Sequence, residues 1–270
     1  MNRILVVIPT KDRECLAWNL MALKAQKAQN FDVLVIGSSK VEIPKDYRYI
    51  KTDKNFVESL NLGLETALKE SYEWVVFFDD DSIPVNYYFD YFDHASKGET
   101  CVGGSCSFLA KHSGIPKIHF DGSVSGSLES FYGMNPAYVG HLQGCNWAVK
   151  LSEVGDIRFD EHLSRVGFRS ETDFQVRLKK KGVKLLWHPA LTVNHLNWKG
   201  GSFDTIKNNY WRGYDHCHYV LKNFGFWPAI IGILLTNRTS PRPLWQGIPA
   251  ALLGKYDLDW YRGFWARLIK

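Results

Sequence analysis

Hydrophobic residues alternate between short unbroken runs and helical spacings along the first 80 residues. Unbroken apolar runs predict buried strands at residues 4–8, 33–36 and 74–78, and a fourth further on at residues 184–187. Between the first three runs, leucines recur every three or four positions, which predicts two amphipathic helices: Leu16, Leu20 and Leu23, then Leu60, Leu64 and Leu68. This order is typical of an α/β fold, with a mostly parallel sheet covered by helices.

Three consecutive carboxylates, Asp79, Asp80 and Asp81, follow the third apolar run. Along an extended chain, Asp79 and Asp81 point to one side and Asp80 to the other. Ligands of parallel α/β sheets bind beyond the carboxyl ends of the strands, and converging carboxylates there suit a magnesium-type ion whose shell substrate phosphates complete. The competing interpretation is an acidic turn, followed by Ser82 and Pro84, that only solvates the strand end.

The rest of the chain divides into three parts. Residues 101–138 are rich in Gly and Ser without clear periodicity and predict loops and short strands. Residues 171–181 predict a helix that Gly182 stops. We expect one domain over residues 1–200 and a helical extension over residues 201–270, broken by prolines at 228, 241, 243 and 249.

Composition narrows the class of protein. With 45% hydrophobic and 23% charged residues, the 270-residue chain is expected to fold. Its five cysteines form no C-x-x-C pair, which argues against a disulfide framework or a structural zinc site and predicts a reducing compartment. No apolar run reaches the roughly 20 residues of a membrane span, and the first is too short for a signal peptide, so we expect a cytoplasmic protein.

The charge is uneven along the chain. Residues 201–270 contain nine basic and four acidic residues and 14 of the 39 aromatic residues, whereas the first 200 residues are neutral. Basic, aromatic segments are typical of membrane surfaces, so we expect peripheral association with the cytoplasmic face of a membrane. A helical cap on the first domain or a homodimer contact is the alternative. A neutral first domain argues against a nucleic-acid partner.

Four separated segments resemble the GT-A-fold glycosyltransferases of the inverting family 2, over roughly residues 3–196. They are VIPTKDR at residues 7–13, Asn61-Leu62-Gly63, FFDDDS at residues 77–82, and GFRSETDFQVRLKKKG at residues 167–182 with His188, Pro189 and His195 beyond it. The last block is the most specific, because its spacing is improbable by chance. Neither a Gly-rich phosphate loop of nucleotidyltransferases nor a G-x-G-x-x-G dinucleotide motif follows a predicted strand.

The resemblance implies a GT-A fold and transfer of a sugar from a nucleoside diphosphate sugar, with a metal ion that offsets the charge of the leaving diphosphate. It assigns Mn²⁺ or Mg²⁺ to Asp79, Asp81 and His195, with a capping or core histidine as the alternative for His195. It assigns donor binding to Pro9, Thr10, Asp12, Arg13, Asn61, Asp79 and Asp80.

An inverting transfer needs one carboxylate base opposite the leaving group. Glu171 aligns with that base, because Ser170-Glu171 stands where the family usually has Glu-Asp. Asp173 is the second candidate, with N-terminal helix capping as its competing role. Asn146 and Trp147 match a loop that lies between donor and acceptor in relatives; Trp147 either stacks on a sugar or is a buried core residue.

The sequence also departs from the family pattern. Gly37, Ser38 and Ser39 stand where an acidic pair often reads the base or ribose, and Leu60 replaces a common phosphate-binding Arg. The base is therefore open among UDP, dTDP and GDP, with UDP expected from its frequency in the family. The expected acceptor is a glycan or a lipid-linked glycan. The alternative function is an inactive carbohydrate-binding or interaction protein on the same fold.

Overall fold

The computed structural model describes residues 3–107, 117–119, 124–125, 135–164, 166–196 and 206–228. The chain forms two compact units. The first comprises Met1–Ile118, Val124–Glu161 and Ser170–Lys199, and the second comprises His119–Ser123, His162–Arg169 and Gly200–Lys270. The sheet and every residue that the resemblance assigns to a site belong to the first unit.

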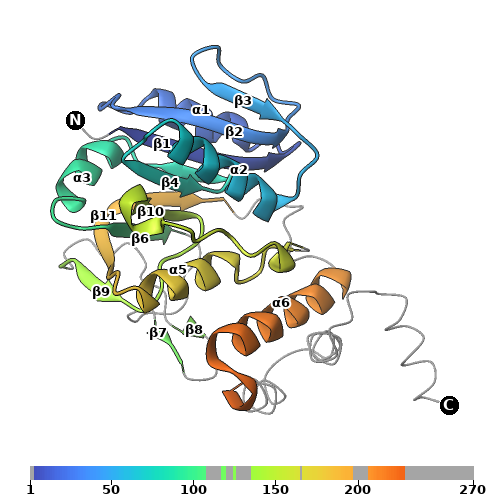
Figure 1. Ribbon diagram of the computed structural model, residues 1–270. Helices are drawn as coiled ribbons and strands as arrows, with labels where there is room; N and C mark the ends of the chain where they lie inside the picture. The colour runs from blue at the N-terminus through green and yellow to red at the C-terminus, as the bar shows by residue number, and fades with distance from the viewer. Residues whose placement is uncertain are drawn as a thin grey trace. The chain divides into compact units, whose positions relative to one another are not determined.

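A central mixed sheet organises the first unit (Figure 1). Its strands, in the order β3-β2-β1-β4-β10-β6-β11-β5, are Arg48–Lys51, Phe31–Ser38, Ile4–Lys11, Trp74–Phe78, Asn146–Lys150, Cys101–Ser107, Leu185–His195 and Ser82–Pro84, and β9 (Ala137–Val139) pairs with β11. The first four strands are parallel, whereas β10 runs antiparallel to both β4 and β6. The predicted α/β class is confirmed, while strand β3 was not predicted because its Arg48 and Lys51 interrupt the apolar pattern. A separate two-stranded ribbon joins β7 (Lys117–Ile118) to β8 (Val124–Ser125).

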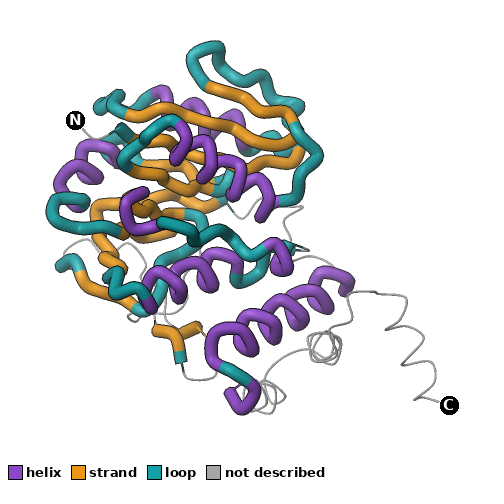
Figure 2. Tube along the Cα trace, in the orientation of Figure 1, coloured by secondary structure: helices purple, strands orange, loops and turns teal. Residues whose placement is uncertain are grey.

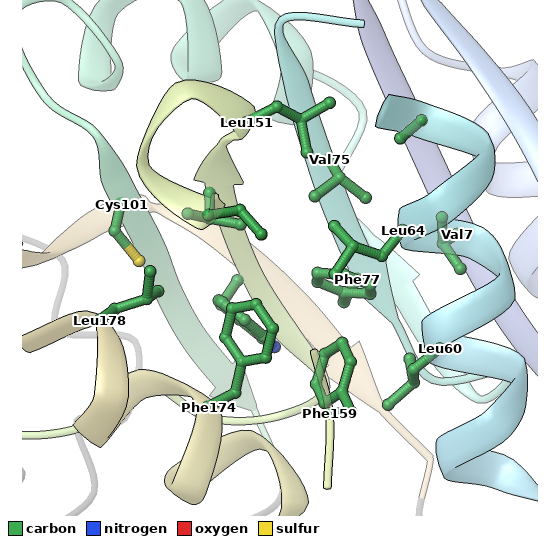
Figure 3. Packing of buried hydrophobic residues seen from close by; sticks show 14 of the residues in the cluster. Val7, Leu60, Leu64, Val75, Phe77, Cys101, Leu151, Phe159, Phe174 and Leu178 are labelled. Carbon is green, nitrogen blue, oxygen red and sulfur yellow. The ribbon is translucent and has the colours of Figure 1, made fainter. Parts of the chain in front are cut away.

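Helices cover both faces of the sheet (Figure 2). On one face lie α1 (Leu16–Lys24) and α3 (Tyr88–Ala95); on the other lie α2 (Phe56–Lys69), α4 (Leu151–Val154) and α5 (Ser170–Lys180). A short 3₁₀ helix, η1, spans Glu161–Leu163. Alternation along the strands supplies the two apolar layers: in β4, Val75 and Phe77 face α2 and α5, while Val76 and Phe78 face α1 and α3. Figure 3 shows Phe77 beside Phe159 and Phe174 in the first of these layers.

Helix α2 is held by its cap and by one glycine. Asn55 and Glu58 form a capping box, in which each side chain accepts a hydrogen bond from the other residue's backbone N–H. Gly63 lies so close to β1 that a Cβ atom there would come 2.4 Å from Val7 Cγ1. The glycine of the Asn61-Leu62-Gly63 motif therefore allows close packing of helix against sheet.

Strand β11 is longer than the predicted run at residues 184–187, because a bulge lets it continue. The register with β6 shifts between His188 and Thr192, and the bulged Leu191 carbonyl accepts a 2.8 Å hydrogen bond from Asn146 Nδ2. After this bulge the strand pairs with β5 and ends at His195 opposite Ser82. The bulge thus brings His195 to the turn that contains the three aspartates.

In the second unit, the described part of the chain includes α6 (Ile206–Phe224). Its buried face includes Tyr214, Asp215 and Tyr219, and the His218 ring lies 5.3 Å from the ring of His162. Gly225 follows with φ of 91°, a left-handed conformation that ends helices. Among the described residues, no helix is both long and apolar enough to cross a membrane. The predicted breaks at Pro241, Pro243 and Pro249 lie outside the described residues.

Candidate functional site

The candidate site forms where three strands end near the turn after β4. Residues 79–81 connect β4 to β5, and β11 brings His195 opposite Ser82. Strand β10 begins with Asn146 paired to Phe78, which places Cys145 beside Asp79 at the strand end. The antiparallel pairing of β10 with β4 therefore adds a residue from far along the chain to the aspartate turn.

Asp79 and Asp81 converge on His195. The His195 Nε2 atom lies 3.5 Å from Asp79 Oδ2 and 3.3 Å from Asp81 Oδ1. Burial lowers the pKa of His195, but Asp79, Cys145 and Asp81 outweigh burial and raise that pKa to about 9. Asp81 is buried and Asp79 half-buried, so these acids are not the solvated turn of the competing interpretation.

Cys145 is a further potential ligand beside Asp79 and His195, and sequence reasoning missed it. Within the described part of the chain, one ligand atom each from Asp79, Cys145 and His195 lie within 4.8 Å of one another. Without a C-x-x-C pair the cysteines predict no structural zinc site, and no sequence motif assigns Cys145 to the metal. The signal that could have located it is its position directly before an apolar strand, but its partner strand cannot be read from spacing.

The donor set fits a divalent cation. Oxygen and nitrogen ligands at about 2.1 Å from one ion lie roughly 3.0–3.4 Å apart at octahedral or tetrahedral angles. The 3.3 Å from His195 Nε2 to Asp81 falls within this spacing, and the 3.5 Å to Asp79 lies just above it. Asp79, Cys145 and His195 are therefore the residues that would hold a metal ion here, and Asp81 Oδ1, 3.3 Å from His195 Nε2, lies beside them.

Asp80 points away from this cluster and ties the loop after β1 to the turn. Its two carboxylate oxygens accept hydrogen bonds from Thr10 Oγ1 at 2.8 Å and from Arg13, which also donates to Asp81 at 2.8 Å. Burial raises the pKa of Asp80 to about 6, although Arg13 and Thr10 both favour the carboxylate. Thr10, Arg13 and Asp80 thus come together, as a bonded group beside the candidate metal ligands.

Two further residues predicted to bind the sugar nucleotide, Pro9 and Asp12, lie next to this group. Pro9 is buried within β1, whereas Asp12 is exposed, with φ of 53° and its backbone N–H bonded to the Ser38 carbonyl at 2.8 Å. Next to them, Gly37 packs so tightly that a Cβ atom would come 2.0 Å from the Thr10 carbonyl oxygen. The ends of β1 and β2 therefore form one rigid edge at this side of the site.

Glu171, the first candidate base, lies over Gly144. A Cβ atom at Gly144 would come 2.7 Å from both Cδ and Oε1 of Glu171, so this carboxylate packs directly against Gly144. Because Gly144 directly precedes Cys145, the glutamate is positioned beside the loop that carries a candidate metal ligand. Arg169, two residues earlier, adopts φ of 70°, a conformation uncommon outside glycine.

Asp173, the second candidate base, is fully buried and paired. Arg177 donates to its Oδ2 atom from Nε at 2.9 Å and from Nη2 at 2.6 Å, and also bonds the Arg158 carbonyl at 2.6 Å. An ion pair one turn apart in a helix stabilises the helix. This environment suits a structural role for Asp173 and leaves Glu171 as the better placed carboxylate.

The Asn61 side chain forms its hydrogen bonds with other residues of this chain. Its Oδ1 atom accepts from the Phe159 N–H at 2.8 Å, and its Nδ2 atom donates to the Phe159 carbonyl at 3.0 Å and to Glu161 at 3.2 Å. Both amide hydrogens are then used. In this structure Asn61 joins α2 to the segment that precedes η1.

The predicted acceptor residues lie in the core, which corrects the expectation that they face the acceptor. Trp147 has no exposed surface and stacks on Phe77 with ring centroids 4.9 Å apart. Asn146 is also fully buried: it donates to the Ser105 and Leu191 carbonyls and accepts from Tyr88 Oη at 2.7 Å. A ring with no exposed face cannot stack on a sugar, so the core interpretation of Trp147 holds here.

Comparisons with solved structures show what this arrangement is similar to. GalNAc-T7 with UDP, GalNAc and Mn²⁺ matches with a TM-score of 0.64 at 12% identity, over 99% of this chain and 57% of that one. TarS of S. aureus matches with a TM-score of 0.52 at 13% identity, over 88% of this chain and 42% of that one. Its fragment 1–349 matches with a TM-score of 0.53 at 12% identity, over 92% of this chain and 79% of the fragment.

No protein-family model matches the sequence, and no curated protein matches it. The chain spans about half the length of the TarS and GalNAc-T7 chains. At such low identity the likeness concerns the fold. The chain has the GT-A fold of glycosyltransferases, as its sequence motifs predicted.

Proposed function

We propose that this protein is a metal-dependent, inverting glycosyltransferase of the family 2 type. The observation that carries the proposal is the convergence of Asp79 and Asp81 on His195 at the carboxyl end of β4. In α/β sheets that edge is where ligands bind. The similar structure of GalNAc-T7 contains UDP, GalNAc and Mn²⁺, which supports a nucleotide-sugar donor and a metal.

The residues take complementary roles in this proposal. A divalent cation held by Asp79, Asp81 and His195 would neutralise the charge that develops on the leaving diphosphate. Thr10, Asp12 and Arg13 line the adjoining strand ends and would contact the nucleotide. The hydrogen bonds of Thr10 and Arg13 with Asp80 keep this edge in place before the sugar nucleotide binds.

Glu171 would act as the general base. It would accept the proton of the acceptor hydroxyl while that oxygen bonds to the anomeric carbon and the sugar–phosphate bond breaks. Glu171 lies over Gly144, whereas Asp173 is buried and paired with Arg177, and this contrast supports Glu171 as the base. The donor proposed is a UDP-sugar and the acceptor a glycan or lipid-linked glycan, with Asn146 and Trp147 shaping the site from within the core.

Calorimetric binding of nucleotides tests the proposal directly. UDP, dTDP, GDP and CMP would be titrated, each with and without Mn²⁺, into the wild type, Asp79→Asn and Asp156→Asn. Asp156 is an exposed aspartate whose side chain is 92% accessible, so its variant controls for loss of one charge. We expect metal-dependent binding of UDP that Asp79→Asn abolishes and Asp156→Asn preserves. Absence of binding by all four nucleotides would favour the inactive carbohydrate-binding alternative.

A further inference from the structure

We propose that Cys145 is a metal ligand through Sγ, and that it makes the site select a divalent transition metal over magnesium. This inference rests on the metal dependence of the proposed function. It concerns a residue outside the aspartates and the histidine that the sequence motifs point to. Cys145 belongs to the loop before β10 and reaches the site only through strand pairing.

The geometry places the sulfur within reach of one ion. Ligand atoms of Asp79, Cys145 and His195 all lie within 4.8 Å of one another. Two ligands at about 2.1 and 2.3 Å from a metal ion are at most roughly 4.4 Å apart, when they lie on opposite sides. Asp79 Oδ2 and His195 Nε2, 3.5 Å apart, are close enough to share one ion, and a side-chain movement of up to about 1 Å brings the Cys145 sulfur onto the same ion. Asp81 Oδ1, 3.3 Å from His195 Nε2, would be a further oxygen donor.

The donor chemistry decides which metals fit. Magnesium binds oxygen ligands almost exclusively and loses its water shell reluctantly. A set of two carboxylates, one imidazole and one thiolate instead suits the borderline metals from manganese to zinc, and thiolate and imidazole favour the later members of that series. Replacing the sulfur by a harder donor would therefore lower affinity for zinc and cobalt while leaving affinity for magnesium nearly unchanged.

The side chain of Cys106 contacts the Cys145 sulfur. Its Sγ atom lies 3.0 Å from Cys145 Sγ, and both side chains are buried. When Cys145 binds a cation, its thiol proton passes to solvent, and the Cys106 S–H remains to donate a hydrogen bond to the thiolate. We assign Cys106 a positioning role: its loss should weaken binding without removing the sulfur–metal bond.

Cobalt spectroscopy separates a ligand from a packing residue. Co²⁺ would be titrated into the full chain, kept reduced with a phosphine so that no added thiol competes for metal. The variants would be Cys145→Ser, Cys145→Ala, Cys106→Ser and Cys101→Ser; Cys101 is an equally buried free cysteine on β6, outside the cluster, and serves as the control. We expect a thiolate-to-cobalt charge-transfer band in the wild type, Cys106→Ser and Cys101→Ser, and none in either Cys145 variant.

Competition calorimetry measures selectivity in the same proteins. Cys145→Ser should narrow the affinity ratio of zinc to magnesium by at least about tenfold, the lower end of what a lost supporting interaction costs, with magnesium affinity nearly unchanged. Thermal unfolding would show whether each variant is folded. If Cys145→Ser is not folded, Cys145→Ala takes its place in the comparison. An unchanged ratio, or no charge-transfer band in the wild type, would overturn the inference. A band without any nucleotide binding would instead contradict the proposed function alone.

Discussion

Individual carboxylates near β4 have different tasks, although they are neighbours in sequence. Asp79 and Asp81 face His195, while Asp80 bonds Thr10 and Arg13. The three residues form the turn that a 3.1 Å hydrogen bond from the Ser82 N–H to the Asp79 carbonyl closes, and in this turn Asp80 points to the loop after β1. The same contrast recurs on α5, where Glu171 reaches the Gly144 loop and Asp173, two residues later, turns inward to Arg177.

This contrast on α5 yields a paired prediction. Glu171→Gln should leave nucleotide binding nearly intact and lower the transfer rate by about 10²- to 10⁴-fold, the range for a lost general base. Asp173→Asn should mainly lower stability, by roughly 3–5 kcal/mol, because it leaves the partly buried Arg177 without its ionic partner. Transfer rates and calorimetry check the first variant, and chemical unfolding checks the second. Full transfer by Glu171→Gln would exclude it as the base.

At the scale of secondary-structure elements, buried amides link segments that the sheet does not join. Asn61 connects α2 to the Phe159 backbone, and Asn146 connects β10 to the bulged part of β11. A buried backbone group without a partner is costly, so each amide satisfies groups that irregular backbone would leave unpaired. These two residues thereby hold in place the segments that position Glu161 and His195.

The Asn61 connection can be tested apart from donor binding. Asn61→Ala removes three hydrogen bonds and leaves the Phe159 N–H and carbonyl without them, so the free energy of unfolding should fall by about 2–4 kcal/mol. Urea unfolding measures this loss. The control is Glu58→Gln, at the half-buried partner of Asn55 in the capping box, which keeps a side-chain acceptor and should lose less than about 1 kcal/mol. If Asn61→Ala were fully stable but unable to bind nucleotide, the residue would instead be a donor ligand.

At the scale of the whole molecule, the second unit differs in character from the first. The boundary proposed at residue 200 separates a sheet-based domain from a basic, aromatic extension, although residues 162–169 also group with the second unit. After α6, Phe226 and Trp227 have exposed fractions of 55% and 71%. Exposed aromatic side chains beside basic residues are typical of membrane-surface segments, and we propose peripheral association through them.

Liposome sedimentation tests this association. The full chain should bind vesicles that contain anionic lipid better than neutral vesicles, and Phe226→Ser with Trp227→Ser should weaken binding to both. Trp18→Ser on α1 is the matched control, because Trp18 has an exposed fraction of 54% in the first unit. A change from dimer to monomer in the double variant, with vesicle binding unaltered, would assign these residues to a homodimer contact instead.

The sequence by itself determined the α/β class, the strand that ends in three aspartates, and the helix that carries Glu171, because each depends on local periodicity or on a motif of adjacent residues. Only the tertiary structure decided which distant residues meet. Cys145 joins Asp79 because β10 pairs antiparallel with β4, and His195 arrives because a bulge carries β11 past His188. Burial also selected the core interpretation of Trp147. Periodicity reports which face a side chain occupies, but the partner across that face is set by strand order and register, which spacing along one chain does not encode.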